Sequence, residues 1–217
     1  MENILEKIAL LVGLLIGITV HECAHAWSAN ELGDPTARYR GRVTLNPIAH
    51  LDPMGSLLML YSLLGGFGIG WGKPTPVNPL NLKYGPRLGM AIVSAAGPLS
   101  NILVAVVFAI PLRMGLRLPG ELTILLRYII AANISLTVFN LLPIPPLDGF
   151  AILRGIVSQI RGLWSYPVAE AFRLVEVQGP LIFIGLLFID WMLPGPGIFG
   201  TLMLPPFRAL FNLIVGA

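Results

Sequence analysis

Five consecutive residues, His21-Glu22-Cys23-Ala24-His25, carry the clearest chemical pattern in the chain. Residues four apart on an α-helix share one face, so the imidazoles of His21 and His25 can reach the same metal ion. Glu22 lies about 100° round the helix from His21, where its carboxylate can meet a water on the metal without binding the metal. Zinc lowers the pKa of such a water, and a neighbouring glutamate can carry its proton. The pattern therefore predicts a zinc site that hydrolyses peptide bonds.

The alternative is that His21, Glu22 and His25 are ordinary polar residues at the end of a helix. They follow a long apolar run, however, and ionisable groups inside a membrane are costly unless they are paired or functional. We therefore favour the metal site. Cys23 points away from the two histidines, so we expect it to be a packing residue.

A catalytic zinc ion usually has three protein ligands, so the histidine pair needs a further partner. Asp148 is the best-placed acid, because it follows a later apolar run that is expected to end at a depth similar to that of His25. The prolines before it bend the backbone, and Gly149 permits an unusual turn. Asp148 is equally suited, taken alone, to be the N-cap of a helix that begins near Ala151. Beside the histidine pair, the ligand role is favoured.

The remaining acids and histidines near apolar runs are weaker candidates for the third ligand: His50, Asp52, Glu121 and Asp190. We expect His50 and Asp52 to shape the turn that precedes Pro53.

The elements that position these groups are predicted to be membrane helices. Of the 217 residues, 55% are hydrophobic and only 12% are charged, whereas charged residues make up about 25% of a soluble domain. A bilayer core is crossed by roughly 20 apolar helical residues. Runs of about this length cover residues 4–27, 87–112, 122–142, 174–193 and 198–215, the last interrupted by Pro205 and Pro206.

Two shorter runs and the N-terminus complete the predicted organisation. Residues 51–67 suit a re-entrant segment, and residues 151–164 suit an interfacial amphipathic helix. The first run lacks the features of a cleaved signal peptide, so we expect a retained helix. The fold class is thus an all-α polytopic membrane protein with about five to six transmembrane or re-entrant helical segments. We expect one integral-membrane domain over residues 1–217, with a core at 5–165 and C-terminal helices at 166–217.

The net charge of +3 does not indicate nucleic-acid binding, because the Lys and Arg residues are scattered in short loops between apolar runs. Their distribution instead predicts orientation, since such residues favour the cytoplasmic side. If the loop after the first span is cytoplasmic, that side holds Arg38, Arg40, Arg42, Lys73, Lys83, Arg87, Arg154, Arg161 and Arg173. The opposite side then holds fewer, namely Lys7, Arg113, Arg117 and Arg127. We therefore expect a multi-pass cell-membrane protein with its site toward the cytoplasm.

Together these motifs resemble the site-2 protease family of intramembrane zinc metalloproteases. That family has H-E-x-x-H on one transmembrane helix and an L-D-G motif at the end of a later one, here residues 21–25 and 147–149. The run Gly97-Pro98-Leu99-Ser100-Asn101 resembles the central helix of the family. Residues 70–79 resemble the Gly/Pro-rich membrane-associated β element of short prokaryotic members. The resemblance covers roughly residues 5–165.

The resemblance implies one zinc ion per chain, with His21, His25 and Asp148 as ligands and Glu22 as the catalytic base. It also implies substrates that are transmembrane segments of other membrane proteins in the lipid bilayer. No PDZ-like or nucleotide-sensing domain is expected in a chain of this length, and no oligomeric state is indicated.

Four further residues are candidates for holding the substrate or a developing oxyanion: Asn101, Asn140, Thr75 and Val77. A buried asparagine amide can donate to an oxyanion, although hydrogen bonding between helices explains Asn101 and Asn140 equally well. Thr75, Val77 and Asn78 keep backbone N–H groups among prolines, so an extended peptide could pair with this segment. The bland alternative is a loop that merely connects two spans.

Two other functions fit part of the pattern. A membrane metal-ion transporter or channel would also place His21, His25 and Asp148 among helices, but it does not require Glu22 at that spacing. A non-catalytic protein that binds membrane segments would not need the intact Glu22. The protease is therefore the favoured prediction.

Overall fold

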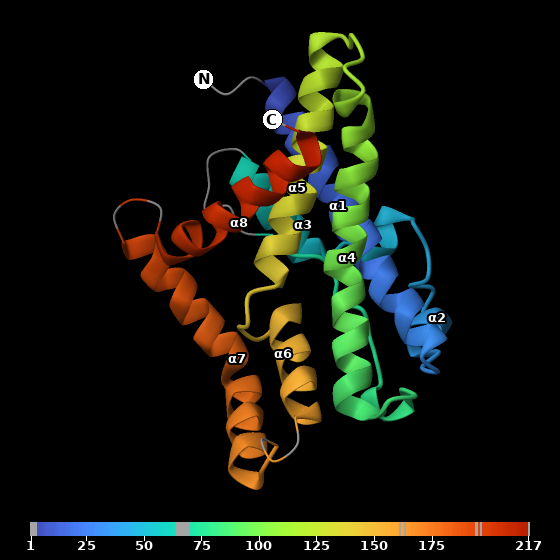
Figure 1. The fold of residues 1–217 in the computed structure, drawn as a ribbon, viewed down its shortest axis with the longest axis vertical. Coiled ribbons are helices and arrows are strands. Elements are labelled where there is room, and N and C mark those ends of the chain that lie inside the picture. Colours follow the sequence, from blue (N-terminus) through green and yellow to red (C-terminus); the bar gives the residue numbers. More distant parts are fainter. Residues whose placement is uncertain are drawn as a thin grey trace.

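The computed structural model describes residues 4–63, 70–160, 162, 164–193, 195 and 197–216, which fold almost entirely into helices (Figure 1). Eight are α-helices within these residues, joined by loops and two short 3-10 turns at Pro47–His50 and Pro79–Asn81. The α-helices are α1 (Ile4–Glu31), α2 (Thr36–Tyr39), α3 (Pro53–Leu63), α4 (Gly85–Arg113), α5 (Gly120–Asn140), α6 (Asp148–Gln159), α7 (Tyr166–Met192) and α8 (Gly197–Val215).

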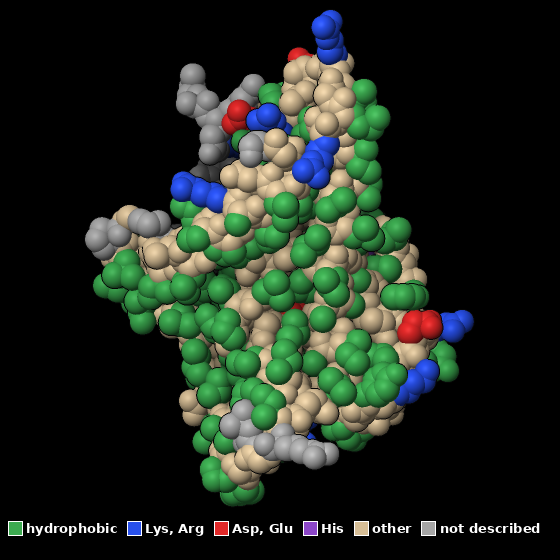
Figure 2. Space-filling view, viewed as in Figure 1, with side chains coloured by type: hydrophobic (Ala, Val, Ile, Leu, Met, Phe, Trp, Pro, Cys, Tyr) green, Lys and Arg blue, Asp and Glu red, His purple; other side chains and the backbone are tan. Residues whose placement is uncertain are grey.

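Five of these helices, α1, α4, α5, α7 and α8, are long and apolar enough to cross a membrane. Figure 2 shows one face of the molecule on which apolar side chains cover the middle, while the visible charged side chains gather at the upper end and at the right-hand edge. This arrangement confirms the predicted all-α polytopic membrane protein. The helices α1 and α5 run in the same direction and α4 runs against them (Figure 1).

Helix α1 packs closely against α5 through a stripe of small residues. Ala9, Gly13 and Gly17 are spaced four apart and are buried, so they lie on one helical face. A Cβ atom on Gly13 would lie 2.9 Å from the Tyr128 carbonyl oxygen of α5, which leaves no room for a side chain. Small residues of this kind let helix backbones approach closely in membranes. The same four-residue spacing continues to His21 and His25, but each step of four residues turns the helix about 40° further. The stripe therefore moves round α1 from α5 to α4, where Gly97 faces both histidine rings.

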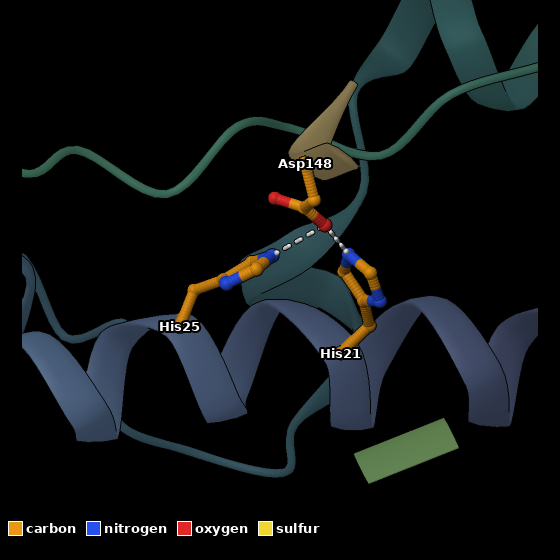
Figure 3. A group of neighbouring side chains, drawn as sticks. All are labelled: His21, His25 and Asp148. Atoms are coloured by element: carbon orange, nitrogen blue, oxygen red, sulfur yellow. Dashed lines mark ion pairs between the residues drawn. The ribbon is translucent and has the colours of Figure 1, made fainter. Parts of the chain in front are cut away.

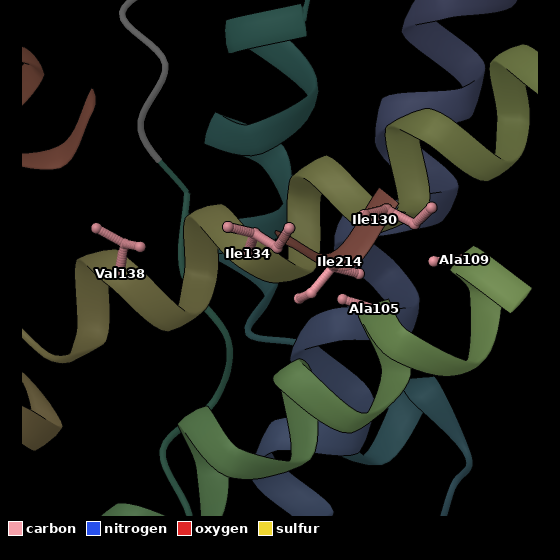
Figure 4. Packing of buried hydrophobic residues seen from close by; sticks show 6 residues of the cluster. All are labelled: Ala105, Ala109, Ile130, Ile134, Val138 and Ile214. Atoms are coloured by element: carbon pink, nitrogen blue, oxygen red, sulfur yellow. The ribbon is translucent and has the colours of Figure 1, made fainter. Parts of the chain in front are cut away.

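Helices α4, α5 and α8 share a buried apolar cluster at the end of the molecule opposite the loop after α1. Its members are Ala105 and Ala109 of α4, Ile130, Ile134 and Val138 of α5, and Ile214 of α8 (Figure 4). The cluster fixes α4 beside α5. Because both helices also contact α1, the three form the core that surrounds the histidines.

Helix α6 begins directly at Asp148 and packs against α4. Gly155 allows this contact, because a Cβ atom there would lie 2.3 Å from the Cβ of Ala91. Gly149 has a different role from the predicted unusual turn, since its φ is not positive. A Cβ on Gly149 would lie 2.3 Å from the Leu141 carbonyl oxygen, so this glycine lets the start of α6 lie against the end of α5.

Helices α7 and α8 are the least buried of the five long helices. Their corner is closed by Asp190, whose Oδ1 accepts a hydrogen bond of 2.8 Å from the backbone N–H of Phe199 in the first turn of α8. Pro205 and Pro206 lie inside α8 and do not interrupt it, contrary to the prediction from sequence.

The predicted β element is not found in the described residues. The only bridge among them is a single antiparallel pair between Leu51 and Gly72, next to a hydrogen bond from the Lys73 N–H to the His50 carbonyl. Pro74, Pro76 and Pro79 remove backbone donors, which prevents a longer ladder. The predicted re-entrant run forms α3, which ends at Leu63, and residues 64–69 lie outside the described part.

Candidate metal centre

The structure brings His21, His25 and Asp148 together. One potential ligand atom from each residue lies within 4.8 Å of the other two. The Nε2 atoms of His21 and His25 lie 3.1 Å and 3.4 Å from Asp148 Oδ2, with the carboxylate facing both rings (Figure 3). The two imidazoles come from adjacent turns of α1, and the carboxylate comes from the first residue of α6.

Each histidine is oriented by a contact at its other ring nitrogen. His21 Nδ1 lies 3.1 Å from Asn101 Oδ1, and His25 Nδ1 lies 2.8 Å from the carbonyl oxygen of Val93. With Nδ1 protonated, each ring donates to α4 and leaves Nε2 free to bind a metal. Contacts of this kind fix the tautomer of metal-binding histidines and increase their affinity.

Gly97 supplies the space for both rings on the α4 side. A Cβ atom at this position would lie 2.5 Å from His25 Cε1 and 2.6 Å from His21 Cε1. Any side chain at position 97 would therefore displace one or both imidazoles. Gly97 was expected only as part of the run that resembles the central helix of the family, and its contact with the histidines could not be read from spacing.

The donor set suits a divalent metal ion such as zinc. Two imidazole nitrogens and one carboxylate oxygen are common ligands of catalytic zinc, which leaves a position open. Asp148 Oδ2 is buried and makes no hydrogen bond of acceptable geometry in the described part of the chain, although two ring nitrogens face it. A buried oxygen of this kind needs a partner. The predicted N-cap role of Asp148 is not seen, because α6 begins at Asp148 itself.

Glu22 lies next to His21, His25 and Asp148 but is not one of the three potential metal ligands. Its Oε2 accepts a hydrogen bond of 2.7 Å from the Thr75 hydroxyl, and it lies 3.7 Å from Arg42 Nη2. Arg42 is almost completely buried and was not among the sequence candidates. The sequence did not predict a role for Arg42 at the site, because it resembled the other arginines of the loop after the first span.

The segment 73–78 runs past Glu22 and is fixed at both ends. Lys73 N–H donates to the His50 carbonyl, and Asn78 N–H donates to Asp34 Oδ2 at 2.7 Å. Burial would raise the pKa of the Asp34 carboxyl, but hydrogen bonds from Thr36, Asn78 and Asn81 outweigh it and lower that pKa. An ionised Asp34 therefore anchors the far end of the segment.

The predicted substrate-binding residues are divided between several places. Asn101 is fully buried behind His21, and this contact favours orientation of the ring over contact with a substrate. Asn140 donates to the Leu136 carbonyl of its own helix. Thr75 contacts Glu22, and Val77 packs against a cluster of Ala29, Leu82 and Val93.

The weaker metal candidates lie outside the group. His50 Nε2 is 2.8 Å from the Thr44 carbonyl oxygen, and Asp52 accepts a hydrogen bond from Gly55 N–H at the start of α3. Both residues therefore shape the turn, as the sequence analysis expected. Asp190 caps α8, and Glu121 lies in the first turn of α5.

Three relatives and one family profile are similar to this chain. The profile of Peptidase family M50 matches residues 118–183. YwhC of Bacillus subtilis, which carries the name of a zinc metalloprotease, is 41% identical over 156 residues, or 68% of each chain. Rip2 of Mycobacterium tuberculosis H37Rv, named in the same way, is 33% identical over 192 residues that cover 87% of this chain and 69% of Rip2.

The third relative is Rip2 of Mycobacterium tuberculosis strain Erdman, also named as a zinc metalloprotease. It is 33% identical over 204 residues, which cover 88% of this chain and 75% of the relative. No solved structure matches the chain significantly.

The contact of Gly97 with both rings predicts that Gly97→Ala weakens metal binding. Because a methyl group would displace the imidazoles, we expect zinc affinity to fall by about 10–100-fold, as for other changes that misorient ligands. Metal analysis of the purified protein, titrated with a competing chelator, measures this. Gly185→Ala is the matched control, because a Cβ at Gly185 meets no atom within 4 Å.

The same titration tests the three ligands. His21→Ala and Asp148→Ala should each remove the roughly one zinc ion per chain that the single donor set predicts. Full zinc retention in both variants would place the metal elsewhere.

Proposed function

Since this chain belongs to the site-2 protease family of intramembrane zinc metalloproteases, Peptidase family M50, we propose that it hydrolyses peptide bonds within or near transmembrane segments of other membrane proteins. The observation that carries this proposal is the convergence of His21, His25 and Asp148 inside a bundle of apolar helices, with Glu22 beside them. A metal site at this position serves chemistry on a substrate that is itself embedded in the membrane.

In the proposed mechanism, His21, His25 and Asp148 hold the zinc ion and Glu22 moves protons. Bound zinc would supply a water of lowered pKa and would polarise the carbonyl of the scissile peptide bond. Glu22 accepts a proton from the attacking water and delivers it to the amine that leaves. Asn101 and the Val93 carbonyl keep the two rings in place during these steps. The C–N bond breaks, and the water contributes its oxygen to the new carboxylate and its two protons to the new amine, which leaves as an ammonium group.

This mechanism predicts that Glu22→Gln abolishes proteolysis and leaves zinc bound, because the amide cannot accept the proton while the ligands are unchanged. A loss of roughly 10²–10⁴-fold in kcat is expected for removal of a general base. Cleavage of a membrane-protein substrate by the purified protein in lipid vesicles, with metal analysis alongside, measures both.

A transport assay on the same vesicles separates the competing function. If Glu22→Gln lost cleavage and still carried zinc across the bilayer at the wild-type rate, the transport would be a second activity. Unchanged cleavage by this variant would eliminate the proposed mechanism.

The substrate-binding segment is proposed to be the extended stretch between Lys73 and Asn78. A transmembrane helix must unwind before its peptide bonds can be attacked, and lipid offers no partners for the exposed backbone. Residues that precede a proline favour an extended backbone, which applies here to Lys73, Thr75 and Asn78. The N–H groups of Lys73 and Asn78 are already engaged.

Thr75 and Val77 retain backbone donors that make no hydrogen bond within the described residues. Alternate residues of an extended chain direct their N–H groups to the same edge. A substrate strand could therefore add to this edge, close to Glu22, with its backbone groups paired. The side chain of Val77 packs into the protein, which holds the edge in place.

This proposal predicts that Val77→Pro reduces cleavage by about 10-fold while zinc stays bound. The loss of one backbone hydrogen bond makes substrate binding weaker by roughly 1–1.5 kcal/mol. Val77→Ala is the matched control, since it loses packing but keeps the N–H. Cleavage kinetics of the two variants decide the matter. Equal activity of Val77→Pro and wild type would exclude the edge as a substrate site.

The orientation is proposed from charge, with the loop after α1 in the cytoplasm. Arg40 is exposed in that loop, and Arg117 is exposed in the connection between α4 and α5. In a Cys23→Ser background, a membrane-impermeant maleimide should label Arg117→Cys in intact cells. Arg40→Cys should be labelled only in inverted vesicles, and the opposite result would reverse the orientation.

A further inference from the structure

We propose that Arg42 is a positioning residue that, together with Thr75, holds the carboxylate of Glu22 and locks it to the segment that borders the site. This inference rests on the proposed role of Glu22 as the base. It adds a function for a buried loop arginine that lies outside the H-E-x-x-H pattern.

Arg42 joins three parts of the chain at one guanidinium group. Nη1 donates to the Ala49 carbonyl at 2.7 Å, and Nη2 donates to the Lys73 carbonyl. Nη2 also lies 3.5 Å from Thr75 Oγ1 and 3.7 Å from Glu22 Oε2. The Arg42 side chain is only 5% exposed, so these contacts replace water almost completely.

Within the described residues, the carboxylate that pairs with the buried charge of Arg42 is that of Glu22. Burying a guanidinium group is costly unless it is paired and hydrogen-bonded. Burial lowers the pKa of Arg42 and the charge of Glu22 raises it, so the pairing offsets part of this cost. The planar fork of arginine can reach two carbonyl groups at once, which an ammonium group cannot do in the same geometry.

Thr75 completes the contact from the segment side. Its hydroxyl lies 2.7 Å from Glu22 Oε2 and 3.1 Å from the Glu22 carbonyl oxygen. Both contacts from Thr75 and Arg42 fall on Oε2. Glu22 Oε1 accepts no hydrogen bond from the described part of the chain. One carboxylate oxygen is thus fixed, and the other is left to accept a proton.

Arg42 and Thr75 link the position of the proposed base, Glu22, to the position of the segment 73–75. The Lys73 carbonyl, which Arg42 holds, lies two residues before Thr75, whose hydroxyl holds Glu22. Displacing the segment 73–75 would therefore release the base, and releasing Arg42 would loosen the segment.

The test compares Thr75→Val with Thr75→Ser, and Arg42→Gln with Arg40→Gln. Valine has the shape of threonine without the hydroxyl, whereas serine keeps it. We expect Thr75→Val to lower kcat by about 10–100-fold, the scale of a misplaced catalytic group, with KM and zinc content unchanged. Arg42→Gln should lower kcat on the same scale with zinc content unchanged, and its KM should also rise because the substrate-binding segment loosens. Thr75→Ser should restore kcat to near the wild-type value. Arg40 is exposed, so Arg40→Gln removes the same charge without the contacts and should have no effect.

A second measurement does not depend on activity. Hydrogen exchange of the backbone between Trp71 and Asn78 should become faster in Arg42→Gln and stay unchanged in Arg40→Gln. In a Glu22→Asp background, whose shorter carboxylate cannot reach Thr75, Thr75→Val should cause no further loss of kcat.

The outcomes distinguish this inference from the proposed function. Retained cleavage in Glu22→Gln would overturn both. Lost cleavage in Glu22→Gln with normal kcat in Thr75→Val and Arg42→Gln would overturn only the positioning role. A fall in zinc content, or a rise in KM at constant kcat, would likewise overturn it, because the residues would then support the metal or the substrate instead.

Discussion

Close packing of α1 against α4 and α5 is the constraint on which the rest of the structure depends. Two imidazoles and a carboxylate are costly inside an apolar bundle unless their polar atoms have hydrogen-bond partners or a metal ion there. The small residues Gly13 and Gly17 bring α5 against α1, and Gly97 brings α4 against the rings. At this distance Asn101 and the Val93 carbonyl reach the outer nitrogens of the histidines. The metal site is thus a product of helix contact.

The second ligand-bearing element depends on the same kind of contact. Asp148 reaches the histidines because α6 starts against the end of α5. Gly149 has no side chain, so its backbone can lie directly against the backbone of Leu141. The L-D-G motif therefore combines a ligand with the absence of a side chain next to it. Its glycine acts by its lack of volume, since its φ lies in the region open to any residue.

Much of the fold and part of the site could be predicted from sequence. Hydropathy located the long helices, because apolar runs of membrane length have few alternatives. Helical periodicity paired His21 with His25, and Asp148 was the acid that the structure brings to them. The β element, which came from the resemblance, is not found in the described residues beyond one bridge, because Pro74 and Pro76 lack the N–H groups that a ladder needs. Arg42 was missed, since a loop arginine buried by distant segments looks like any other loop arginine until those segments are placed.

The four-residue spacing that joins Ala9, Gly13, Gly17, His21 and His25 forms a stripe that winds round α1 from its contact with α5 to the metal ligands beside α4. Each residue of an α-helix turns the chain by about 100°, so one residue inserted between Gly17 and His21 would rotate the histidines away from Gly97 of α4 while Gly13 stayed against α5. Substitutions on the lipid-facing side leave this stripe untouched. The lipid-facing positions of the first helix should therefore vary freely, while the number of residues between Gly17 and His21 stays fixed.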